Sequence, residues 1–140
     1  MVLVFVYDRM KSSKELEKFL SVADFTHIGS TKTSGHYLMF TPYDRADPQV
    51  CRVSDFMDHV MQANHIQGEL YDVTVAGLSR LDQIYDVPRI RDRQLIGLEG
   101  FAQAFAYITN KTGIDEAKLW NIQLKTIKIG DWTLPKHITV

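Results

Sequence analysis

The chain has 140 residues and a formal net charge of -1, from 16 basic and 17 acidic side chains. This length is typical of one domain that buries its core without disulfides or metals, so we expect a single domain over residues 1–140. The balanced charge lacks the basic surface of a general nucleic-acid binder. The single cysteine, Cys51, excludes an internal disulfide and any cysteine-cluster metal site.

The apolar run at residues 2–7 is short, and the charged residues Asp8, Arg9 and Lys11 follow it. A secretory signal has a longer apolar stretch and a small-residue cleavage site. No stretch of the sequence approaches the ~20 apolar residues that span a bilayer. We therefore expect a soluble, cytoplasmic protein with no membrane partner.

The first third of the chain predicts strands with one intervening helix. Residues 2–7 are β-branched and aromatic without alternation, which indicates a central strand buried on both faces. Ser12 and Glu15 are spaced as a capping box at the start of a helix over residues 13–21. Residues 26–32 and 35–40 then predict two strands joined by a turn, followed by a loop over residues 41–48.

An amphipathic helix is expected after Ser54, with Phe56, Met57, Val60 and Met61 on one face. The ordinary interpretation of this face is that it packs in the core. The alternative is that it binds a partner protein.

The second half predicts a strand, a helix, a hairpin, a helix and a last strand. The strand covers residues 65–73, and the following helix contains residues 78–84 and stops before Pro88. Residues 93–98 and 101–109 form the hairpin, residues 114–120 the helix, and residues 123–129 the last strand. The whole pattern predicts an α+β domain with a small, mixed, β-barrel-like sheet and peripheral helices.

The sequence lacks the motifs of several common catalytic and binding sites. The glycines form no phosphate-binding loop of the GxGxxG or GxxxxGK[ST] type, and the five histidines include no i, i+4 pair. We therefore predict no cofactor and no metal site. Cys51 precedes Arg52, but a thiol nucleophile also needs a positioned base, so a structural cysteine is the better interpretation.

One polar segment has a position suited to anion binding. Tyr7, Asp8, Arg9 and Met10 lie between the buried strand and the first helix. A strand-to-helix turn exposes backbone N–H groups at the positive end of a helix dipole. The plain alternative is a polar connecting loop.

A series of short motifs resembles the γ-glutamylcyclotransferase-like (AIG2-like) superfamily, which includes the γ-glutamylamine cyclotransferases. Residues 4–10 are similar to its "VFVYGTL" strand and loop, and residues 65–73 to its "V.GE[LV]Y.V" strand. The remaining matches are "L..LD" at 78–82, "Y.R..V" ending at 96, "A..Y" at 104–107 and "GDW" at 130–132. These matches follow the family's order along most of the chain.

The resemblance implies a small closed or nearly closed barrel flanked by helices. The family's reaction is an intramolecular acyl transfer, in which the α-amine of a γ-glutamyl group attacks its own γ-carbonyl and releases an amine and 5-oxoproline. Backbone amides of the loop after the first strand hold the substrate. A glutamate near the end of the "LD..E" helix accepts the proton from the attacking amine.

The sequence departs from this pattern at the implied site. Asp8 stands where the family has glycine, Arg9 replaces a small hydroxyl residue, and Met10 replaces leucine. Tyr85 stands at the position of the catalytic glutamate, and Arg91 replaces the tyrosine of "Y.R". A phenol with an ordinary pKa of ~10 is a poor base at neutral pH.

These departures favour a divergent member of the family that has lost the standard cyclisation, a pseudoenzyme. Its pocket, lined by Tyr7, Asp8, Arg9, Met10 and Tyr85, would bind a small anionic or amide-containing ligand or a protein partner.

Two alternatives stay open at this stage. The first is an active γ-glutamyl(amine) cyclotransferase that releases 5-oxoproline with Asp86, or less readily Glu69, as a substitute base. The second is an unrelated small α+β protein-interaction domain whose resemblance to the family is incidental.

Overall fold

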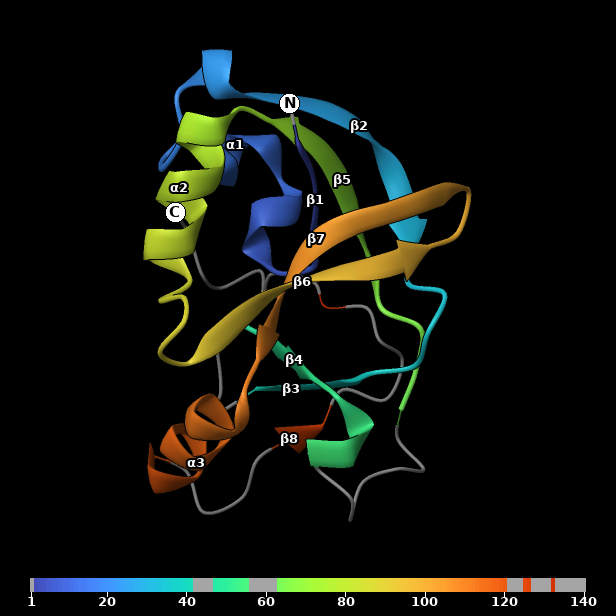
Figure 1. Ribbon diagram of the computed structural model, residues 1–140, viewed down its shortest axis with the longest axis vertical. Coiled ribbons are helices and arrows are strands. Elements are labelled where there is room, and N and C mark those ends of the chain that lie inside the picture. The colour runs from blue at the N-terminus through green and yellow to red at the C-terminus, as the bar shows by residue number, and fades with distance from the viewer. Residues whose placement is uncertain (1, 42–46, 56–62, 121–124, 127–131, 133–140) are drawn as a thin grey trace.

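The computed structural model describes residues 2–41, 47–55, 63–120, 125–126 and 132 (Figure 1). Short helices lie between several of the strands, and the longest helices follow the fifth and seventh strands. In chain order the elements are β1 (Val2–Val6), η1 (Arg9–Lys11), α1 (Ser13–Leu16), η2 (Val22–Asp24), β2 (Phe25–Lys32), β3 (Leu38–Thr41), β4 (Gln49–Cys51), η3 (Val53–Asp55), β5 (Gln67–Val73), α2 (Val75–Ile84), β6 (Arg91–Leu98), β7 (Phe101–Thr109), α3 (Lys111–Trp120) and β8 (Lys125–Thr126).

The strands form a five-stranded mixed sheet and a smaller three-stranded sheet. The large sheet has the order β2-β5-β1-β7-β6, and the small one has the order β4-β3-β8. β1 pairs antiparallel with β5 and parallel with β7, so the first strand of the chain lies at the centre of the large sheet. Figure 1 shows α1 and α2 on one side of this sheet and the small sheet with α3 below it.

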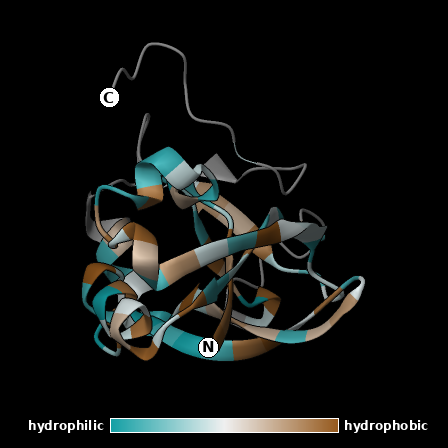
Figure 2. Cartoon of the chain, turned by 90° about the horizontal axis from the view of Figure 1, so that it is seen from above, coloured by the Kyte–Doolittle hydropathy of each residue, from teal (hydrophilic) through white to brown (hydrophobic). Residues whose placement is uncertain are grey.

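β1 is buried on both faces, which confirms the sequence prediction of a central strand. Val4 and Val6 pack with the residues of η1, α1 and α2 in one core cluster. Phe5, on the other face, packs with side chains of β3, β4 and β7 in a second cluster. All three side chains are at most 3% exposed. Figure 2 shows hydrophilic and hydrophobic segments interspersed along the ribbons.

The α+β fold class is confirmed, whereas the prediction of a barrel is wrong for the described part of the chain. The two edge strands, β2 and β6, approach each other at one end only. An isolated bridge joins Thr33 to Leu98, and the amide of Ser34 donates to the carbonyl of Gly97 at 3.0 Å. A closed barrel needs ladder pairing along the length of both edges. The sheet is therefore strongly curved and open.

Two local predictions in the first third are wrong. α1 ends at Leu16, and the Ser12 side chain makes no capping hydrogen bond. The Glu15 carboxylate pairs with Lys18 at 2.9 Å, so no capping box forms. β2 and β3 do not form a hairpin, since they belong to different sheets. The Thr33 hydroxyl, which accepts from the amide of Ile66 at 2.9 Å, fixes the chain toward β5 at this point.

The second half agrees closely with the sequence predictions. α2 begins after Thr74, whose hydroxyl accepts from the amide of Gly77 at 3.1 Å. β6 and β7 form the predicted hairpin, and Gly100 adopts a φ of 77° in its turn, a conformation that favours glycine.

Some predictions fall on residues that the structure does not describe. The helix face at Phe56, Met57, Val60 and Met61, most of the loop over residues 41–48 and most of the last strand over residues 123–129 lie outside the described ranges. No helix within those ranges is long and apolar enough to cross a membrane. The cytoplasmic location stays a prediction.

Candidate functional site

The loop after β1 meets the end of α2 through one carboxylate. Asp8 is the N-cap of η1, and its Oδ1 accepts a hydrogen bond from the amide of Met10 at 3.0 Å. Its Oδ2 accepts a hydrogen bond from the Tyr85 hydroxyl at 2.7 Å. Asp8 and Tyr85 are 77 residues apart in the sequence. The structure therefore brings together the two most important departures from the family's motifs.

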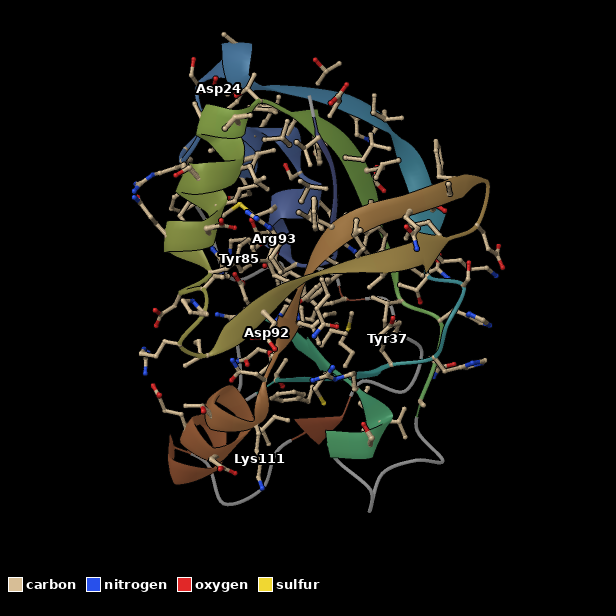
Figure 3. All side chains as sticks on the ribbon, viewed as in Figure 1. Asp24, Tyr37, Tyr85, Asp92, Arg93 and Lys111 are labelled. Atoms are coloured by element: carbon tan, nitrogen blue, oxygen red, sulfur yellow. The ribbon has the colours of Figure 1, made fainter. Side chains whose placement is uncertain are left out.

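Tyr85 is held in place on several sides. It is the C-cap of α2, and its ring stacks on the Tyr107 ring of β7 with centroids 4.3 Å apart and planes 15° apart. The Arg91 guanidinium lies 5.5 Å from the centroid of the Tyr85 ring, and its Nη1 donates to the Tyr85 carbonyl at 3.1 Å. In Figure 3 Tyr85 lies at the end of α2 that faces the β6–β7 hairpin.

Burial makes Asp8 the titrating group of this site. The residue is 5% exposed, and loss of hydration raises the pKa of its carboxyl to about 6. The charge of Asp47 raises the pKa further, whereas the hydrogen bonds from Tyr85 and Met10 lower it. The pKa of Tyr85 lies well above its ordinary value because of burial and the neighbouring Asp8. At neutral pH the protonated Tyr85 therefore donates a hydrogen bond to a largely ionised Asp8.

A cavity of about 320 Å³ opens beside this pair. Its wall contains two carboxylates, two guanidinium groups, one phenol and three apolar side chains. The lining residues are Asp8, Arg9, Met10, Phe19, Asp47, Ile84, Tyr85 and Arg91.

One ion pair forms within this wall. Arg9 Nε donates to both carboxylate oxygens of Asp47, at 2.7 and 3.0 Å. Asp8, Arg9, Met10 and Tyr85, which the sequence assigned to the pocket, thus all line one cavity.

Tyr7 does not line this cavity. Its ring is 3% exposed, and its hydroxyl donates to the backbone carbonyl of Tyr107 at 2.6 Å. Burial raises the pKa of this phenol well above its ordinary value. Tyr7 therefore anchors the end of β1 to β7 and thereby fixes the start of the loop that carries Asp8.

The two candidate substitute bases also lie away from the cavity wall. Asp86 has a φ of 58°, and its carboxylate pairs with the Arg89 guanidinium at 2.6 Å. Glu69, on β5, pairs with His27 at 2.8 Å and accepts from the Ser30 hydroxyl at 2.9 Å on the face of the sheet. Neither carboxylate is among the residues that line the cavity.

Sequence reasoning did not assign Phe19, Asp47, Ile84 or Arg91 to the pocket. Arg91 carried a usable signal, because it stands two residues before the motif arginine and so points from β6 to the same side as Arg93. Asp47 carried none, since only the tertiary fold brings it to Arg9.

A second polar cluster includes the hydroxyl of Tyr107, whose ring stacks on Tyr85. Asp82 pairs with Arg93 Nη1 at 2.5 Å and accepts from the Tyr107 hydroxyl at 2.8 Å. All three residues match the family's motifs at their positions. The cluster ties α2 to both strands of the β6–β7 hairpin, and so it fixes the helix end that carries Tyr85.

The described residues include no group of three or more histidine, cysteine, aspartate or glutamate side chains arranged to hold a metal ion. The polar groups that line the cavity are carboxylate, guanidinium and phenol groups.

Comparisons with known proteins give a family profile and several similar folds. Residues 4–134 match the profile of the family described as "Gamma-glutamyl cyclotransferase, AIG2-like". The fold is similar to the crystal structure of an AIG2-like protein from Mus musculus, with 18% identity and a TM-score of 0.62, covering 79% of this chain and 78% of that one. No curated protein sequence matches the chain.

Two further structures extend the likeness. The solution structure of ytfP from Escherichia coli has 20% identity and a TM-score of 0.62, with 94% of this chain and 96% of that one covered. Part of the allophanate hydrolase of Kluyveromyces lactis, in its S177A form, has 21% identity and a TM-score of 0.61, covering 91% of this chain but only 19% of that one. At these sequence identities the similarity shows a shared fold.

Proposed function

We propose that the chain, which belongs to the γ-glutamylcyclotransferase, AIG2-like family, is a divergent member that binds a small anionic or amide-containing ligand in the cavity beside Asp8 and Tyr85. It does so in place of the family's standard cyclisation. The family match removes the alternative of an unrelated interaction domain. A protein partner stays a prediction from the sequence alone.

The observation that carries this proposal is the hydrogen bond between Tyr85 and Asp8, at 2.7 Å. By resemblance, the loop of the family holds its substrate through backbone amides, and a glutamate at the position of Tyr85 accepts a proton. Here the Met10 amide is already bound by Asp8 Oδ1 at 3.0 Å. The phenol at the glutamate position is a hydrogen-bond donor with a raised pKa, so it accepts no proton at neutral pH.

Arg91 supports the anionic or amide-containing character of the ligand. Arg9 is occupied by Asp47, whereas no carboxylate in the described ranges forms an ion pair with Arg91. Arg91 Nε is a buried donor without a hydrogen-bond partner among the described residues. Since a buried N–H donor without an acceptor is unfavourable, a carboxylate or amide oxygen of a ligand is the natural complement of Arg91 Nε.

Asp86 as a substitute base is the weaker alternative. Its carboxylate is engaged by Arg89 outside the cavity, and a general base must reach the proton it removes.

The test measures cyclisation and binding in the same samples. We expect wild-type protein incubated with γ-glutamyl-ε-lysine to produce no 5-oxoproline above the uncatalysed background, as followed by mass spectrometry. We expect the same compound to shift the amide resonances of Met10 and Tyr85 in NMR spectra.

The double variant Asp8→Gly/Tyr85→Glu restores the two family residues, and we expect it to gain 5-oxoproline production. Each single variant is its matched control, because either one leaves a departure in place. Production of 5-oxoproline by the wild type would contradict the proposal. Its loss in Asp86→Asn would identify the Asp86 alternative as correct.

A further inference from the structure

We propose that the ligand of this cavity carries a primary amine that binds to Asp8 as a cation, with Tyr85 as the residue that positions the carboxylate. The inference rests on the proposed function, since it names the ligand class of the same cavity. By resemblance, the loop of the family contacts its substrate with backbone amides, which are hydrogen-bond donors. In this chain the same loop would contact the ligand with a carboxylate, which is an acceptor.

The hydrogen bonds of Asp8 leave part of its acceptor capacity unused. An ionised carboxylate offers about four acceptor positions. Asp8 uses one for the amide of Met10 and one for the hydroxyl of Tyr85, and both donors are neutral. No cation in the described part of the chain forms an ion pair with Asp8. A donor brought by a ligand would complete this set.

The charges around the cavity favour a cationic donor at Asp8. Arg9 and Asp47 neutralise each other at 2.7 Å. This leaves Asp8 and Arg91, which influence each other electrostatically but share no hydrogen bond among the contacts of the described residues. A ligand that places an ammonium group at Asp8 and an anionic or amide oxygen at Arg91 matches both groups. A buried ammonium–carboxylate contact is a charge-assisted hydrogen bond, which is stronger than a neutral one.

Tyr85 acts through Asp8 and takes no proton itself. Its ring is fixed against Tyr107 with centroids 4.3 Å apart, so the direction of its hydroxyl toward Asp8 Oδ2 is set before a ligand arrives. Such a fixed donor keeps the carboxylate in one orientation, which lowers the entropy lost when an amine binds.

The affinity for an amine should depend on pH. The charged and titratable groups around Asp8 are Tyr85 from α2, Arg91 from β6 and Asp47 from the segment before β4. Tyr7, Arg9 and the Met10 amide lie beside it on its own segment. Tyr85 keeps its proton near neutral pH, because burial and the neighbouring Asp8 raise its pKa well above the ordinary value. Because the pKa of Asp8 is about 6, acidification below that value discharges the carboxylate and removes the attraction for an ammonium group.

Three probes separate the amine from the rest of the ligand. L-Glutamine carries an amine, a carboxylate and an amide; glutaramic acid lacks the amine; 4-aminobutanamide lacks the carboxylate. We expect the full chain at neutral pH to bind L-glutamine at least about tenfold more tightly than glutaramic acid by NMR titration. In Asp8→Asn the two affinities should become equal, and 4-aminobutanamide should bind less tightly than to the wild type. The matched control is Asp115→Asn, which removes an exposed carboxylate on α3.

Each outcome decides the inference. If glutaramic acid binds wild-type protein as tightly as L-glutamine, the amine subsite is wrong while the proposed ligand cavity stands. If none of the three probes binds, the proposed function fails with it.

Tyr85→Phe keeps the ring and serves where Asp8→Asn does not fold. The ratio between L-glutamine and glutaramic acid affinities should fall in this variant. The ratio should also fall in the wild type on acidification to about pH 5, below the pKa of Asp8. A ratio that stays constant in both measurements would overturn the role of Asp8.

Discussion

The stacked rings of Tyr85 and Tyr107 connect two polar clusters, which satisfy their charges differently. In the scaffold cluster, formed by Asp82, Arg93 and Tyr107, the carboxylate has a guanidinium at 2.5 Å and a hydroxyl at 2.8 Å. In the cavity cluster, formed by Asp8, Tyr85 and Arg91, the carboxylate has only neutral donors.

The difference is consistent with the roles that we propose for the two clusters. The scaffold cluster is complete within the protein, and its residues match the family's motifs, so its role is to hold α2 on the β6–β7 hairpin. The cavity cluster keeps a carboxylate and a guanidinium that do not pair with each other, at positions that depart from the motifs. A buried charge without a counter-charge costs stability, and such a cost is typical of a binding site.

The largest effect should come from opening the scaffold cluster. Asp82→Ala removes the acceptor of both Arg93 and Tyr107, and we expect the free energy of unfolding to fall by about 2–3 kcal/mol. Urea unfolding followed by circular dichroism measures this loss. Asp115→Ala, on the exposed face of α3, should change stability by less than about 0.5 kcal/mol. Equal effects of the two substitutions would show that the scaffold cluster does not hold the fold.

The stability that the cavity cluster contributes should change with pH in the opposite sense to that of an ordinary ion-paired aspartate. The pKa of Asp8 is about 6 in the folded chain, above the ordinary value of ~3.9 for an unfolded chain. The folded state therefore binds this proton more tightly. The stability contributed by Asp8 is complete below about pH 4 and is lost as the pH rises through about 6.

As the pH rises from about 4 to about 6, the free energy of unfolding of the wild type should fall by about 2–3 kcal/mol relative to that of Asp8→Asn. Urea unfolding across this pH range measures the difference. Parallel pH profiles of the two proteins would show that burial does not perturb Asp8. Asp115→Asn should keep the wild-type profile.

A smaller effect should follow from loss of the Tyr85 hydroxyl within the cavity cluster. Tyr85→Phe keeps the stacking on Tyr107 but removes one donor to Asp8, so we expect a loss of about 1 kcal/mol in stability. The pKa of Asp8 should rise further, because the Tyr85 hydrogen bond lowers it. NMR titration of the Asp8 carboxyl carbon measures this shift. Tyr37→Phe, on a tyrosine without a contact to Asp8, should leave the pKa unchanged.

The sequence predicted those parts of the fold that depend on local pattern. The unbroken apolar run of β1 indicated burial on both faces, and the apolar spacing before Pro88 indicated α2. The hairpin at Gly100 followed from turn chemistry. The sequence misjudged the pairing of β2 and β3, because Thr33 and Ile66 are brought together only by the fold.

For the candidate site, too, some features follow from the sequence and others only from the fold. From the sequence alone, the family resemblance located the loop at Asp8 and the helix position at Tyr85 and showed that both depart from the family's residues. Only the tertiary structure decided that the two departures share a hydrogen bond and that Asp86 pairs with Arg89 outside the cavity. The physical reason is that side-chain type is local, whereas burial, and with it the pKa of Asp8, is set by the elements that pack around the residue.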